Sequence, residues 1–201
     1  MDDRSPASAM QGFLRSRRSI RKFTGEPVSA DVLREILESA CFAPSAHGMQ
    51  PWRFAIVENQ SARDALGLAL TDQMRRDMQA EPAPAAEIAQ RVQRSRQRIA
   101  EAPVLLLLCR DVEALRVHAV EEDLMAIQSV AMAGLQLMLA AQAHGLGANW
   151  ICWPLYAQAE TIRALNLPET WQPQGMVFLG HPAEQPKEKV LRPLSELTKT
   201  I

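Results

Sequence analysis

The spacing of apolar side chains along the chain predicts amphipathic helices that alternate with short apolar strands. The clearest helical pattern opens at Pro27 and Ser29, repeats apolar residues three and four positions apart as far as Cys41, and stops at Pro44. We expect the other helices over residues 5–16, 62–79, 86–101, 121–144 and 157–165. Runs rich in branched and aromatic residues predict strands over residues 52–58, 104–109, 148–153 and 174–179.

Two of these segments lack a polar face. Residues 104–109 are the longest dense apolar stretch, which predicts a strand buried on both faces and is far too short to span a bilayer. Residues 121–144 open with three acidic residues, where the helix dipole favours negative charge, and continue with a body that is apolar nearly all round. We therefore expect a central buried helix there.

The order of elements predicts one α+β domain over residues 1–201. We find no internal repeat and no low-complexity linker, so the pattern gives no reason to divide the chain. Residues 183–201 form a tail with little periodicity, and we expect this tail to act as an arm toward a partner subunit.

Composition narrows the class of protein. Hydrophobic residues make up 47% of the chain and charged residues 22%, which is typical of a globular domain, and a net charge of −1 gives no general attraction to nucleic acid or an anionic membrane. Cys41, Cys109 and Cys152 lie far apart, which argues against a disulfide framework. The first ten residues lack the apolar core of a signal peptide. We expect a cytoplasmic protein, and the scattered histidines predict no metal site.

A basic segment near the N-terminus is the first candidate for chemistry. Arg17, Arg18, Ser19 and Arg21 lie just before a Thr-Gly turn, and in an extended chain Arg17, Ser19 and Arg21 point to the same side. Two guanidinium groups and a hydroxyl that converge in this way suit a phosphate. A solvated basic segment or a nucleic-acid patch accounts equally well for the residues alone.

Three other segments are candidate binding elements. Residues 43–52 form a loop with two prolines, a glycine, Ser45, His47 and Gln50, ahead of a strand. Residues 145–154 combine glycines that end a helix with Cys152 and Trp153. The tail carries three cations, Lys187, Lys189 and Arg192. Each segment on its own is also explained by an ordinary connection, a helix stop or solvated charge.

Together these four segments resemble the nitroreductase family of FMN-dependent oxidoreductases. The resemblance rests on RRSIRKF, APSAHGMQPWRF, GLGANWICWPL and FLGHPAEQPKEKVLRPL, in this order, over most of residues 12–197. A finer likeness, carried by SRQRIAEAPVLLLLC, WICWPL and RPLSEL, is to the nitroreductase-type domain of the γ-glutamyl ligase that makes the deazaflavin cofactor. The fold that this implies is a central mixed β-sheet flanked by helices, in an intertwined homodimer.

The resemblance also implies a role for each segment. Arg17, Arg18, Ser19 and Arg21 would hold FMN at and near its phosphate, helped by tail cations at Lys187, Lys189 and Arg192. The loop would line the flavin from the partner subunit through Pro44, Ser45 and Gln50. Many family members have an asparagine where this chain has Gly48, so His47 either replaces that contact or is exposed and idle. Backbone N–H groups at Cys152 and Trp153 would face the reactive ring nitrogen.

The implied activity is reduction of an oxidised organic acceptor by NADH or NADPH. The flavin would carry the chemistry in ping-pong order, without a catalytic amino acid, and the acceptor would be a nitroaromatic, a quinone or a related small molecule. The alternatives are a reductase for a deazaflavin-cofactor precursor, a flavin-consuming or dehalogenating enzyme, and a non-catalytic module that binds nucleic acid or another anion. Neutral net charge and the lack of aromatic residues among the arginines weigh against nucleic acid.

A second basic region, residues 70–102, is where we expect substrate choice to lie. Its six arginines include Arg91, Arg94 and Arg98, which share one face of a helix. A solvated face is the simpler interpretation, and an anionic substrate is the alternative.

Overall fold

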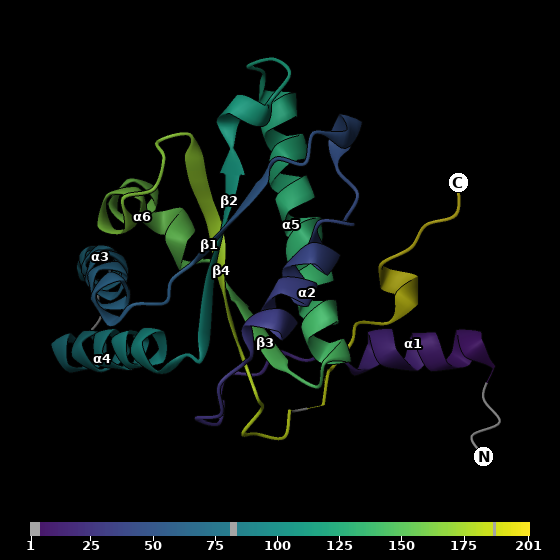
Figure 1. The fold of residues 1–201 in the computed structure, drawn as a ribbon, viewed down its shortest axis with the longest axis horizontal. Helices are drawn as coiled ribbons and strands as arrows, with labels where there is room; N and C mark the ends of the chain where they lie inside the picture. The colour runs from purple at the N-terminus through teal and green to yellow at the C-terminus, as the bar shows by residue number, and fades with distance from the viewer. Residues whose placement is uncertain (1–4, 81–83, 187) are drawn as a thin grey trace.

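The computed structural model describes residues 5–80, 84–186 and 188–201 and shows a four-stranded sheet covered by helices on both faces (Figure 1). The strands lie in the order β1-β2-β4-β3. Their bounds are Trp52–Ile56 for β1, Val104–Asp111 for β2, Gly147–Ile151 for β3 and Trp171–Gly180 for β4. The predicted α+β class is confirmed.

All three strand pairs in this sheet are antiparallel. Among the described residues, a parallel pairing enters only as the isolated bridge between Ser19 and Ala148, which adds the basic segment to the edge at β3. The sheet is therefore less mixed than the family resemblance implies. β2 and β4 both run further than predicted, because polar residues at their ends continue the ladder to Asp111 and from Trp171.

The central strand β2 is buried along its whole length, as its composition predicts. Its side chains alternate between two cores. Leu106 and Leu108 face one cluster, whereas Leu105 and Leu107 face the other. A strand with helices on both sides has no solvated face, so every position is apolar until the end of the run.

Helices α2 (Ala30–Ala40) and α5 (Val120–Ala143) cover one face of the sheet. Helices α3 (Gln60–Gln79), α4 (Ala85–Glu101) and α6 (Gln158–Leu165) cover the other, together with the short helix η3 (Trp153–Tyr156) (Figure 1). Ser29 caps α2 through a bond from the N–H of Val32 to its hydroxyl, which explains why the pattern starts there.

The prediction that α5 is buried all round is wrong. Small and apolar residues on one side, such as Ala133 and Leu137, pack into the core, but Leu124 is 53% exposed and Leu135 is 47% exposed. Helix α5 is also long and apolar enough to cross a membrane. Core helices of globular proteins commonly have the same length and composition. Its apolar outer face lacks a covering element among the described residues.

Helices α3 and α4 form an insertion between two strands that pair with each other. Ile56 at the end of β1 lies opposite Leu106 in β2. The chain leaves the sheet after β1, forms the two helices and re-enters the sheet at β2. Arg63 fastens the junction, since its guanidinium donates to the carbonyl oxygens of Val57, Ala100 and Ala102 at 3.0, 3.2 and 2.5 Å. Burial lowers the pKa of Arg63.

The two ends of the chain extend away from this body on the same side (Figure 1). Helix α1 (Pro6–Ser16) has no buried residue, and the amide of Gln142 in α5 holds its last turn by donating to the carbonyl of Phe13 at 2.8 Å. The tail beyond Pro182 contains one short helix, η4 (Leu194–Glu196), and is exposed nearly throughout.

Candidate functional site

The basic segment lies between the edge of the sheet and the start of the tail. The N–H of Ile20 donates to the carbonyl of Ala148 in β3 at 3.0 Å, and the N–H of Ala183 donates to the carbonyl of Lys22 at 2.9 Å. Because the backbone is paired on both sides, residues 19–22 are extended, as the phosphate hypothesis requires.

Two adjoining cavities open beside this segment. One, of about 430 Å³, is lined by Arg17, Ser19, Arg21 and Lys189, together with Arg18. The other, of about 460 Å³, shares Arg17 and Arg18 and is bounded by the end of α5 and the glycines that follow it. The structure therefore brings together five of the predicted phosphate ligands, from segments about 170 positions apart in the sequence.

A carboxylate that the sequence analysis missed also lines both cavities. Glu184 Oε1 accepts hydrogen bonds from the N–H groups of Arg21 at 2.5 Å and Lys22 at 3.2 Å, so it fixes the tail against the segment. The contact joins residues 163 apart, and nothing in the local pattern signals it. The guanidinium of Arg18 is turned inward and donates to the carbonyl of Arg15 at 2.7 Å.

Two tail cations are not placed in this cluster. Arg192 is exposed and does not line either cavity in the single chain. Lys187 lies outside the described residues. Their predicted contacts with a phosphate stay predictions.

The loop between α2 and β1 is anchored at both ends. The Ser45 hydroxyl accepts from the N–H of Gln50 at 3.1 Å, and the N–H of Ala46 donates to the buried Ser129 hydroxyl of α5 at 3.3 Å. At its far end, the guanidinium of Arg53 pairs with Asp111 at 2.8 Å. The loop is thus a fixed platform on the upper part of α5.

This platform has an unusual backbone. His47, Gly48 and Gln50 have φ values of 52°, 66° and 47°, in the left-handed region that favours glycine and asparagine. Glycine and asparagine both tolerate the positive φ of Gly48, which is compatible with the asparagine that the family resemblance implies at this position. His47, Gln50 and Pro44 are exposed.

On one chain the loop and the cation cluster do not meet. The loop contacts α5 at Ser129, whereas the cavity beside Arg17 and Arg18 reaches α5 at Met138 and Gln142. Nine to thirteen residues of helix separate these contacts by about 14–20 Å along its axis. In the single chain the loop and the cation cluster therefore lie at different positions along α5.

The end of β3 presents backbone donors. Among the hydrogen bonds of the described residues, the N–H groups of Cys152 and Trp153 have no acceptor. Cys152 is exposed, and its sulfur accepts from the indole N–H of Trp150 at 3.2 Å. The indole of Trp150 fills the space beside Gly134 and Gly175, where an added Cβ would overlap its ring. Trp150 therefore fixes the place where these two donors are exposed.

Comparison with known proteins identifies the fold. A sequence profile of the nitroreductase family matches residues 14–181. The chain belongs to the nitroreductase family. The resemblance carried by the four sequence segments is confirmed, as is the nitroreductase-like architecture.

Three relatives illustrate the range of similarity within the family. The NADH dehydrogenase of Thermus thermophilus is 30% identical over a region that covers 84% of each chain. The 5,6-dimethylbenzimidazole synthase of Rhodospirillum rubrum is 29% identical over 187 residues, which cover 91% of this chain and 86% of the relative. A solved structure of a protein assigned as a nitroreductase, in complex with FMN, from Desulfovibrio desulfuricans is 29% identical, with a TM-score of 0.74 over 98% of both chains.

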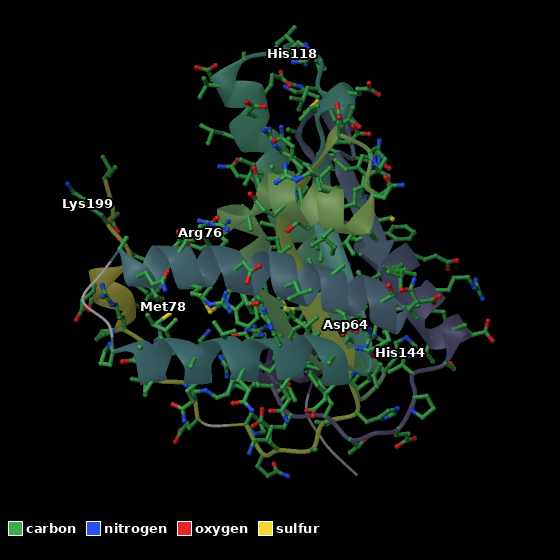
Figure 2. The ribbon with its side chains drawn as sticks, turned by 90° about the vertical axis from the view of Figure 1, so that its left-hand side faces the viewer. Asp64, Arg76, Met78, His118, His144 and Lys199 are labelled. Carbon is green, nitrogen blue, oxygen red and sulfur yellow. The ribbon has the colours of Figure 1, made fainter. Side chains whose placement is uncertain are left out.

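Ionisable groups elsewhere in this family member have structural roles. Arg110 is buried and pairs with Asp123 at 2.5 Å, so Asp123 does more than complement the dipole of α5. In the described part of the chain, three or more metal-ligating side chains do not cluster anywhere. His118 and His144 lie far apart (Figure 2).

The three thiols differ in reactivity for a physical reason. Cys41 and Cys152 are exposed, whereas Cys109 is fully buried in β2, and burial raises its pKa to about 12. The neutral thiol therefore stabilises the fold fully below its unfolded pKa, and this contribution is lost as pH rises toward the folded value.

We expect a Cys41→Ser, Cys152→Ser variant to show no reaction with a disulfide reagent at about pH 8 until denaturant is added, because only the thiolate reacts. The measurement is the yield of coloured thiol product with time, before and after unfolding. Rapid reaction of the native variant would show that Cys109 is accessible.

Proposed function

We propose that this protein is an FMN-dependent oxidoreductase that uses NADH or NADPH to reduce an oxidised organic acceptor in ping-pong order. The observation that carries the proposal is the convergence of Arg17, Ser19, Arg21 and Lys189 on one cavity in a chain of the nitroreductase family. The FMN complex of the Desulfovibrio relative and the names of the other relatives support it.

The residues present fit FMN at two separate points. Four cations line the cavity beside Ser19 together with the carboxylates of Glu184 and Glu188, and the excess of positive charge suits the phosphate. The N–H groups of Cys152 and Trp153, which have no acceptor among the described residues, suit a polar edge of the ring system. Ser19 is bridged to Ala148, and the four steps from Ala148 to Cys152 span about 13 Å of extended chain. An elongated ligand with a phosphate at one end and a ring at the other matches this separation.

When bound, FMN would supply the hydride-transfer chemistry between the nicotinamide donor and the acceptor. The protein's part is to hold and orient the cofactor and to adjust its reduction potential. Arg17, Ser19 and Arg21 bind the phosphate, and Lys189 and Arg192 reach it from the tail. Arg18 contacts FMN beyond the phosphate, at its ribityl chain or its pyrimidine end. Gln50, with His47 where relatives use asparagine, contacts the polar edge of the ring. Cys152 and Trp153 donate through their backbones, so the Cys152 thiol is not a nucleophile.

The working unit in this proposal is a homodimer with two sites at its interface. Exposed apolar side chains lie on α1, α5 and the tail, as Phe13, Leu124 and Leu197 show, and large exposed apolar surfaces mark contact regions. Pro44 and Ser45 then approach the flavin from the partner, and their separation from the cation cluster on one chain supports this arrangement. The dimer works in the cytoplasm, and residues 183–201 serve as the arm.

A second candidate follows from the Rhodospirillum relative, which is named a 5,6-dimethylbenzimidazole synthase. The dimethylated benzene ring of that product is also part of flavin, so flavin would then be the substrate and not a returning cofactor. Reduction of a deazaflavin-cofactor precursor, suggested by the finer resemblance, stays a further prediction of the same site.

We expect the purified protein to show the visible absorption of bound flavin, and this absorption to bleach when NADH or NADPH is added without air. It should return fully when an acceptor such as a quinone is supplied. The measurement is the spectrum through repeated cycles. Stoichiometric loss of the flavin bands favours the synthase-like reaction, and a colourless protein that takes up no FMN contradicts both candidates.

We expect Arg17→Ala or Arg21→Ala to weaken FMN binding about tenfold to a hundredfold, because a hydrogen bond to a charged group contributes roughly 1.5–3 kcal/mol. Flavin fluorescence during titration of the flavin-free protein measures the dissociation constant. Arg34→Ala, on the exposed side of α2, is the matched control and should leave it unchanged. If Arg34→Ala weakened FMN binding equally, the assignment of Arg17 and Arg21 to the phosphate would be wrong.

We expect two defective chains to complement each other if the sites are shared. Arg17→Ala, Arg21→Ala disables the cation cluster and Ser45→Trp disables the loop, so each variant alone has no complete site. A mixed dimer has one site built from the intact cluster of one chain and the intact loop of the other. Co-expressed variants should recover FMN to about half of the mixed dimers' sites, and no recovery would place the whole site on one chain.

A further inference from the structure

A separate cavity of about 460 Å³ lies between α3, α4 and η3. Figure 2 views the molecule from this side, with the two helices in front of the sheet. Its lining is apolar and aromatic on one side, where Leu70 and Met74 of α3 meet Trp153 and Tyr156 of η3. Such a surface accommodates the flat body of an aromatic molecule.

The other side of this cavity is positively charged. Arg91, Arg94 and Arg98 of α4 line it, against the single carboxylate of Asp77. Among the described residues, Arg94 and Arg98 make no ion pair or side-chain hydrogen bond, and Arg91 lies 3.8 Å from Glu87. Like charges three and four positions apart on a helix repel, so the arrangement costs stability unless an anion joins it.

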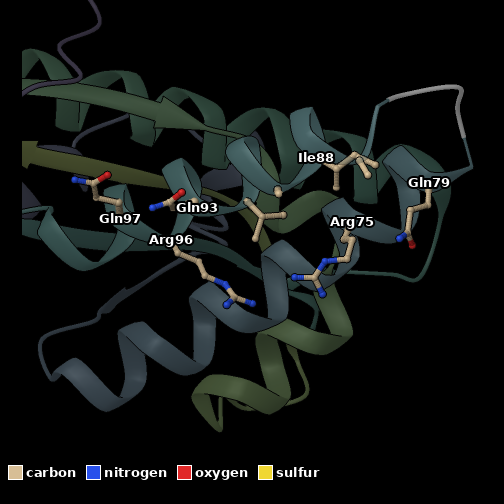
Figure 3. Close-up of a pocket in the computed structure, with 9 residues that line it drawn as sticks. Arg75, Gln79, Ile88, Gln93, Arg96 and Gln97 are labelled. Atoms are coloured by element: carbon tan, nitrogen blue, oxygen red, sulfur yellow. The ribbon is translucent and has the colours of Figure 1, made fainter.

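The remaining arginines of these two helices are satisfied by partners. Arg75 pairs with Asp72 at 3.0 Å, and Arg96 donates to the Thr71 hydroxyl at 2.9 Å and approaches Asp72 at 3.5 Å. Both line a different cavity of about 710 Å³, where the helices meet (Figure 3). The unpaired guanidinium groups thus gather on the side that faces Trp153.

The position of this cavity connects it to the proposed flavin site. Trp153 lines the cavity, and its own N–H and that of Cys152 are the unpaired donors at the end of β3. A molecule seated here has its body against Trp153 and is therefore next to the place assigned to the flavin ring. This step rests on the proposed function.

We propose that the cavity binds the electron acceptor, and that the acceptor is an aromatic molecule carrying an anionic group, a carboxylate or a phosphate. Trp153 and Tyr156 contact its ring, and Arg94 and Arg98 bind its anion. The planar fork of arginine suits both kinds of anion. The basic face of α4 is a specificity element in this proposal, which follows the second of the two interpretations that its sequence allows.

The test is binding to the oxidised, flavin-loaded protein, measured by titration calorimetry without a nicotinamide donor. The probes are para-nitrobenzoate, para-nitrophenyl phosphate and the neutral para-nitrobenzamide. We expect at least one anion to bind about tenfold more tightly than the amide, as one charge-assisted contact provides. An Arg94→Gln, Arg98→Gln variant should lose that preference and keep the affinity for the amide, and the better of the two anions identifies the natural group.

The matched control is Arg75→Gln, Arg76→Gln, which removes the same charge from α3, at half-buried Arg75 and exposed Arg76, outside the proposed acceptor cavity, and should keep the preference. Equal affinities for all probes, or the same loss in both variants, would overturn the proposal. Flavin absorption of each preparation is recorded first. A protein without flavin contradicts the proposed function, whereas a flavin-loaded protein that does not distinguish the probes contradicts only the anionic acceptor.

Discussion

Trp150 occupies a space that only two glycines leave open, and the arrangement of the site depends on this fit. Its indole lies against Gly134 of α5 and Gly175 of β4, where any Cβ would collide with the ring. The residue therefore fixes the distance between helix and sheet at the strand that carries both ends of the site. Two residues before it, Ala148 holds the basic segment, and two residues after it, Cys152 begins the exposed backbone donors.

Local patterns were sufficient to predict most elements of the fold. The apolar run at residues 104–109 indicates a strand buried on both faces, and Ser29 marks the start of α2. Both features can be predicted because burial and helix capping depend on residues that are adjacent in the sequence. The prediction failed for α5, whose apolar outer face is indistinguishable in sequence from a buried one. Pairing order and register were also beyond reach, since they depend on contacts between segments far apart.

The site was predictable where one short segment carries several ligands. Charge and alternation mark Arg17, Ser19 and Arg21 in the sequence, and the structure places Lys189, which the family resemblance predicted, beside them. Glu184 was missed because its contact spans 163 residues and an isolated glutamate in a tail has no signature. For the arginines of α4, sequence spacing gives the shared face, but only the fold shows that Trp153 lies opposite.

The attachment of α3 and α4 has an evolutionary consequence. The pair is inserted at the mouth of a β-hairpin, and Arg63 ties its entry and exit together by donating to carbonyl groups on both sides of the junction. Changes at the exposed positions of the two helices leave the pairing of β1 and β2 in place. Selection can thus reshape the wall of the cavity at Arg94 while the scaffold for the cofactor stays the same, so a new substrate range is reachable in small, independent steps.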